Sequence, residues 1–224
     1  MDLLNTSISI SKSIIKLLCD GYETEAFAIW RTLHECEATL LILEKHGDVA
    51  INAYLKHMAY GLAYRKNDEE GQELMKEVFA SMEKHDLKKK DTKKFIEYGW
   101  LYEIPGWDKI VDFKLNFRNG IQALAGLTNY ATIYMNSSEI LHSTPMLIYS
   151  NRRYYYSLTL ICLYESFFRI ESVFEKLYLS LVDDNGKKSF MEMKKMYYSQ
   201  LNAIHKREAD EFNKQAKNPK EKDA

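Results

Sequence analysis

The sequence predicts an all-α protein, a multi-helix bundle of about six to eight helices that ends in a long C-terminal helical hairpin. Only 3 prolines and 9 glycines interrupt its 224 residues, so few positions break a helix. Leu, Lys, Glu, Ala and Met, which favour helices, are abundant. Apolar residues also recur at helical spacing through most of the chain.

Helical spacing divides the first half of the chain into four helices. The first covers residues 3–19, although the alternation Ile8-Ser9-Ile10 could also indicate a strand. The second ends at His46-Gly47, because glycine is common just beyond a helix C-terminus. Two more helices cover 48–65 and 68–87. The earlier of these two carries apolar residues at helical spacing, namely Ile51, Tyr54, Leu55, Met58 and Leu62.

The middle of the chain carries weaker patterns. The run "KKKDTKK" at 88–94 is expected to be a solvated connection. Residues 95–113 hold two tryptophans and an internal Pro-Gly, which indicates an ordered loop pinned by aromatic side chains. A short helix is expected at 114–126. Another is expected at about 127–143, stopping near Pro145 because the residue before proline disfavours the helical conformation.

The last third of the chain is predicted to form two long helices. They cover about 151–183 and 189–214 and are joined by a turn at Asp183-Asp184-Asn185-Gly186. Helical hairpins of this kind often pack on a partner subunit. We therefore divide the chain into a helical domain at 1–149, a hairpin at 150–215 that packs on it or on a partner, and a disordered polar tail at 216–224.

Composition excludes several classes of protein. The formal net charge of −1 gives no global attraction to nucleic acid or to anionic lipid. No segment is long and apolar enough to span a membrane, and the start lacks the pattern of a signal peptide. Cys19, Cys36 and Cys162 are far apart and form no CxxC pair, so neither a zinc site nor a disulfide framework is indicated. We expect a cytoplasmic homodimer with reduced, buried thiols, no membrane contact and no cofactor.

Polar residues interrupt two apolar helices in a regular way. Tyr134, Ser138 and His142 are four residues apart, so they form one stripe on a helix, with Glu139 beside it. In the second helix, Arg31 and Glu35 are also four apart, within "AFAIWRTLHECEATLLIL". A buried arginine needs a partner, because an unpaired buried charge is costly. We therefore predict that the two helices face each other through Arg31, Glu35, Tyr134, Ser138, Glu139 and His142.

These residues carry a resemblance to a known family. The chain resembles the bacterial and archaeal family catalogued as Domain of Unknown Function 5677 over roughly residues 10–145. It shares an A-x-x-x-x-R-x-x-x-E helix, here Ala26, Arg31 and Glu35, and a Y-x-x-x-S-x-x-x-H helix, here Tyr134, Ser138 and His142. The resemblance implies an all-helical domain with a recurring polar set and no established reaction.

Three functions remain open at this point. In the first, the polar set is a satisfied network that fixes helix register. The protein would then be an accessory or effector module of a bacterial defence or stress system, acting through protein contacts, for example at the hairpin. In the second, it is a metal-independent ribonuclease in which His142 is the general acid or base and Arg31 binds phosphate. Glu35 would orient one of them, and Tyr134 and Ser138 would position the RNA.

The third function is a carboxylate and histidine metal site. Glu139 and His142 have the Glu-x-x-His spacing of di-metal helical bundles. Such sites need a second motif of this kind and two further glutamates, and Arg31 would repel a cation nearby. The sequence therefore favours a site without metal. The ribonuclease alternative also departs from the usual pattern, because no arginine precedes His142 at the expected spacing on its own helix.

Overall fold

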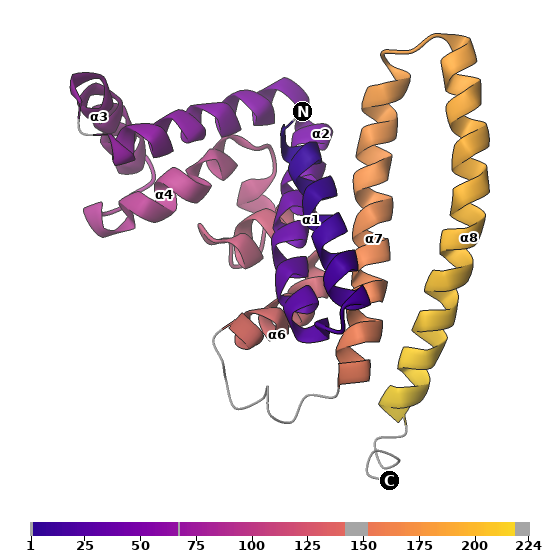
Figure 1. The fold of residues 1–224 in the computed structure, drawn as a ribbon. Coiled ribbons are helices and arrows are strands. Elements are labelled where there is room, and N and C mark those ends of the chain that lie inside the picture. Colours follow the sequence, from indigo (N-terminus) through magenta and orange to yellow (C-terminus); the bar gives the residue numbers. More distant parts are fainter. Residues whose placement is uncertain (1, 67, 142–151, 218–224) are drawn as a thin grey trace. The chain divides into compact units, whose positions relative to one another are not determined.

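The computed structural model describes residues 2–66, 68–141 and 152–217 (Figure 1). These residues form helices and turns and contain no strand, which confirms the all-α prediction and decides residues 8–10 in favour of helix. Within the described ranges, no helix is long and apolar enough to cross a membrane. The chain forms two compact units. The first unit is Met1–Leu40 with Thr132–Ala224, and the second is Leu41–Ala131.

The first unit contains α1 (Asp2–Cys19), the beginning of α2 (Glu23–Arg65), and the further helices α6 (Ala131–Leu141), α7 (Arg152–Leu179) and α8 (Asp184–Lys217). Helix α1 packs on α7, and α7 packs on α8 along the hairpin that the sequence predicts (Figure 1). Buried side chains at helical spacing, such as Phe27, Trp30 and Leu33 of α2 and Leu158 and Cys162 of α7, form its core.

The second helix of the hairpin, α8, begins slightly earlier in the chain than expected. Asp183 precedes α8 and its Oδ1 accepts a hydrogen bond from the Gly186 amide at 2.8 Å. This is the role of an N-cap residue, and it starts the helix at Asp184 rather than at Ser189. Further along, Lys194 of α8 pairs with both Glu171 and Glu175 of α7. The two helices are therefore held by a polar network as well as by apolar packing.

The second unit is built from shorter pieces. They are the remainder of α2, α3 (Glu69–Glu83), α4 (Thr92–Tyr98) and α5 (Gln122–Leu124), the 3₁₀ turns η1 (Lys89–Asp91), η2 (Gly99–Glu103), η3 (Trp107–Lys109) and η5 (Thr128–Tyr130), and the π-helical turn η4 (Phe117–Ile121). Their core contains Tyr60, Val78, Met82, Phe95 and Ile96. The sequence does not predict helix α4, because its lysines are typical of a solvated connection, whereas Phe95 and Ile96 hold that segment in the core.

Aromatic packing orders the segment after α4, as the sequence predicts. The ring of Tyr102 lies 3.8 Å from that of His85 and 4.8 Å from that of Trp107, measured between ring centres. Trp107 in turn contacts Phe113 at 5.3 Å. This cluster fixes a stretch that has little regular secondary structure of its own.

Helix α2 is interrupted at Gly47, close to the predicted helix end. Gly47 has φ 56° and ψ −136°, a backbone conformation that other residues rarely adopt. Beyond it, the buried face of α2 consists of Ala50, Ala53, His57, Tyr60 and Ala63. The large apolar residues that predict the helix mostly point away from this face: Ile51, Leu55, Met58 and Leu62 are 41%, 54%, 52% and 59% exposed.

Candidate functional site

The Arg31 cluster, consisting of Arg31, Glu35, Tyr134 and Ser138, joins α2 to α6 within the first unit. Arg31 Nε lies 3.2 Å from Glu35 Oε1, and Arg31 Nη1 donates a hydrogen bond to Ser138 Oγ at 2.9 Å. The Tyr134 hydroxyl donates to Glu35 Oε1 at 2.5 Å. The Arg31 guanidinium also lies 4.6 Å from the centre of the Tyr134 ring. The structure thus brings together four of the six residues expected to meet.

Burial differs among the members of the Arg31 cluster. Tyr134 is buried, whereas the side chains of Arg31 and Glu35 are 27% and 40% exposed. Burial and the adjacent Glu35 carboxylate raise the pKa of Tyr134 far above its ordinary value, so the phenol keeps its proton and remains a donor. Burial acts to lower the pKa of Arg31, but Tyr134 and Glu35 outweigh it and the pKa rises. The cluster is therefore a charged, hydrogen-bonded connection between helices with access to solvent.

Of the other two expected members, one is placed away from the cluster and the other is not described. Glu139 is exposed on α6. His142 lies outside the described residues, as does the segment that carries Pro145. No group of three His, Cys, Asp or Glu side chains is placed to hold a metal ion within the described ranges.

A second polar group lies deeper between α2 and α7 and was not expected from the sequence. His34 and Glu37 are both fully buried, and His34 Nδ1 donates to Glu37 Oε1 at 2.5 Å. Arg169 Nη2 donates to the same oxygen at 3.1 Å. The ring of Trp30 stacks on His34 with centres 4.9 Å apart. Glu37 Oε1 is therefore buried between nitrogen atoms of two side chains.

One signal for this group is present in the sequence. Ala26, Trp30, Leu33, Glu37 and Leu40 share one face at helical spacing, so Glu37 replaces an apolar residue on a core face. Spacing cannot identify a partner 132 residues away.

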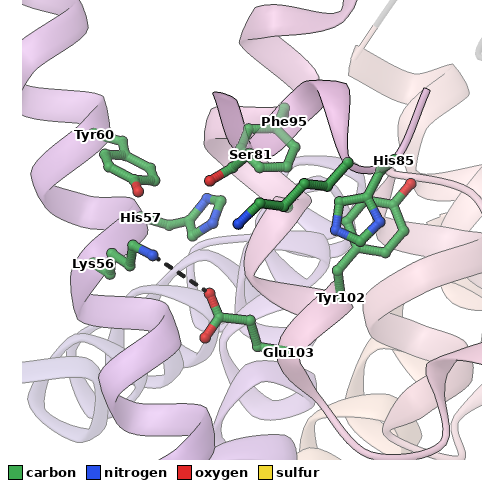
Figure 2. A pocket seen from close by; sticks show the side chains of 10 residues that line it. Lys56, His57, Tyr60, Ser81, His85, Phe95, Tyr102 and Glu103 are labelled. Atoms are coloured by element: carbon green, nitrogen blue, oxygen red, sulfur yellow. Dashed lines mark ion pairs between the residues drawn. The ribbon is translucent and has the colours of Figure 1, made fainter. Parts of the chain in front are cut away.

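The second unit contains a small polar pocket (Figure 2). Its volume is about 210 Å³, and it is lined by Lys56, His57, Tyr60, Ser81, Lys84, His85, Phe95, Gly99, Tyr102 and Glu103. In Figure 2, Lys56 reaches across toward Glu103, with Nζ 3.9 Å from the carboxylate. The lining residues come from α2, α3, α4 and η2 and from the segment after α3, so no motif spacing could have predicted the pocket.

His57 is a buried side chain in the wall of this pocket. It is 5% exposed, and its Nδ1 donates to the Ile96 carbonyl at 3.2 Å, which leaves Nε2 as an acceptor. Burial lowers the pKa of His57 more than its hydrogen bond raises it. The pocket therefore combines two imidazoles, those of His57 and His85, with two lysines and one carboxylate, an arrangement that could hold a small polar molecule.

Comparison with known proteins identifies a matching family. The model of the family described as "Family of unknown function (DUF5677)" matches residues 1–153. No curated protein and no solved structure matches the chain. The match includes the whole Arg31 cluster and the second unit, and it ends at the first residues of α7.

Proposed function

The chain belongs to this family of unknown function, and from that premise we propose that it is a helical accessory or effector module that acts through contacts with other proteins. The observation that carries the proposal is the closed end of the α7–α8 hairpin, where both helices and the turn between them expose large apolar side chains. They are Phe174, Leu177, Leu181, Met191, Met193 and Met196. Methionine is flexible and polarizable, so such a surface can adapt to a partner helix or groove.

The Arg31 cluster supports this interpretation. Its donors and acceptors bind one another, and they connect α2 to α6 at points 99 and 107 residues apart in the chain. A network of this kind fixes the relative position of two helices. Under the proposal, the polar residues hold the first unit in shape, and the hairpin makes the contact. We further propose that the module works as a homo-oligomer.

Copurification tests the role of the hairpin. Full-length tagged protein is recovered from its native cells as wild type, as Leu181→Asp/Met196→Lys, and as Val111→Asp. Leu181, Met196 and Val111 are 80%, 64% and 86% exposed, so each change replaces an exposed apolar residue and leaves the core intact. We expect a stoichiometric partner with the wild type and with Val111→Asp that is absent with the hairpin variant. Equal recovery with all three proteins would refute the proposal.

A ribonuclease is the second candidate, and one observation favours it. Arg31 keeps 27% of its side chain exposed and donates to Ser138, which lies four residues before His142 in the sequence. A guanidinium in this position could bind a phosphate, and His142 could transfer the proton. Purified protein is incubated with total RNA beside the His142→Ala and Arg31→Gln variants. Cleavage that both variants abolish, in proteins with unchanged circular dichroism, supports this candidate; equal cleavage or none refutes it.

A further inference from the structure

Helix α2 exposes a row of apolar side chains in the second unit. We call Ile51, Leu55, Met58 and Leu62 the outer seam of α2. Their separations of four, three and four residues are those of the core positions of a coiled coil. Each is between 41% and 59% exposed, whereas the alanines on the opposite face of the same helix are buried. A row of this spacing is suited to pack against another helix.

Charges at the two ends of the outer seam indicate what that helix is. Continuing the same spacing by one step in each direction reaches Asp48 and Arg65, and both are exposed. The seam therefore begins with an acidic residue and ends with a basic one. From Asp48 to Arg65 the helix rises about 26 Å, at about 1.5 Å per residue.

This arrangement is self-complementary when two copies run antiparallel. A two-fold axis between Leu55 and Met58 sets Ile51 of one copy opposite Leu62 of the other. The same axis sets Asp48 opposite Arg65 at both ends. A parallel pair would instead place Asp48 beside Asp48 and Arg65 beside Arg65, which is unfavourable. We propose that two copies of this chain associate through the outer seam of α2, antiparallel, with an Asp48–Arg65 ion pair at each end.

The inference rests on the proposed homo-oligomer and names its surface. The test measures the dissociation constant of the full-length protein by sedimentation at several concentrations. Asp48→Arg sets two arginines opposite each other, and Arg65→Asp sets two aspartates opposite each other. Each single variant is expected to weaken the dimer by about tenfold, because attraction becomes repulsion at both ends. The double variant Asp48→Arg/Arg65→Asp restores opposite charges and is expected to regain most of the affinity.

Two further variants distinguish the outer seam from the rest of the protein surface. Leu55→Lys places a charge at the centre of the seam and is expected to give a monomer with unchanged circular dichroism. Val111→Lys alters another exposed apolar residue of the second unit and is expected to leave the dimer intact. If none of the seam variants weakens the dimer, or if the double variant binds as weakly as the single ones, the proposed interface is wrong but the homo-oligomer is not. If the wild type is a monomer, for example because its own chain covers the seam, both the interface and the homo-oligomer are wrong.

Discussion

Replacing Glu37 with glutamine should destabilise the first unit much more than the same change at Glu35. The two carboxylates are two residues apart on α2 and each accepts from an arginine at almost equal distance, 3.1 Å for Glu37 and 3.2 Å for Glu35. They differ in burial. The Glu37 side chain is fully buried, whereas that of Glu35 is 40% exposed. Distance alone therefore predicts equal effects, and burial predicts unequal ones.

The magnitude follows from how strongly solvent screens each pair. Two unit charges 3.1 Å apart attract by about 5 kcal/mol at an effective dielectric constant of about 20, and by about 1 kcal/mol in water. Desolvation offsets part of the larger value, but glutamine removes the carboxylate charge that faces Arg169, and breaking a fully buried ion pair in this way costs about 3–5 kcal/mol. Arg169 is 23% exposed, so we expect a loss near the lower end, about 3 kcal/mol, for Glu37→Gln. For Glu35→Gln we expect at most about 1 kcal/mol.

Urea denaturation measures both variants. Trp30 stacks on His34 and is the tryptophan of the first unit, whereas Trp100 and Trp107 lie in the second. In a Trp100→Phe/Trp107→Phe background, tryptophan fluorescence therefore reports on the unit that carries the mutation. A loss of about 3 kcal/mol lowers the midpoint by about 1 to 3 M urea. Equal midpoints for the two variants, or a larger loss for Glu35→Gln, would refute the argument from burial.

Three further predictions concern other parts of the chain. Gly99→Ala should destabilise the second unit by about 1–3 kcal/mol, because the added Cβ would lie 2.7 Å from His57 Cε1. Gly61→Ala should instead stabilise α2 by about 0.5–1 kcal/mol. Urea denaturation compares the two variants. Burial lowers the folded-state pKa of His57, so the unfolded chain takes up the proton first as pH falls. The free energy of unfolding should therefore decrease below about pH 6.5, by at most about 1.4 kcal/mol per pH unit. The decrease should be steeper for the wild type than for His57→Asn, and equal slopes would contradict the prediction. Cys19 is exposed and should react quickly with a thiol reagent. Cys162 is buried, and burial raises its thiol pKa, so it should react only after unfolding. If the native protein is labelled rapidly at a site that the Cys162→Ser variant lacks, the prediction is wrong.

Local spacing was sufficient to predict the long helices and the central part of the Arg31 cluster. Residues four apart share a helix face, so Arg31 with Glu35, and Tyr134 with Ser138, could each be placed on one face from the sequence. The need of a partly buried arginine for partners then suggested that the two faces meet, and the hydrogen bond from Arg31 to Ser138 is such a contact. The sequence could not predict the contacts around the Arg31 cluster, because they depend on how elements distant in the chain pack together.

The pocket of the second unit could not be predicted for that reason. In the sequence, His57 is one position among several on a helix face, and its neighbours Lys84 and Glu103 belong to other elements. Helix α4 could not be predicted because a lysine run looks the same in a solvated loop as at a helix start. The expectation of buried cysteines is correct for Cys162, whereas Cys36 is half-buried and Cys19 is exposed.

The two halves of α2 show why an apolar stripe alone does not identify a core. At 100° per residue, Leu33, Leu40, Ile51 and Met58 would lie on one face of an unbroken helix, by about 3.6 residues per turn. Leu33 and Leu40 are buried, yet Ile51 and Met58 are 41% and 52% exposed. The non-helical backbone at Gly47 separates them, and beyond it small residues, His57 and Tyr60 form the buried face instead. The stripe therefore continues past the break without a core to cover it, which is the property expected of a surface that pairs with another helix.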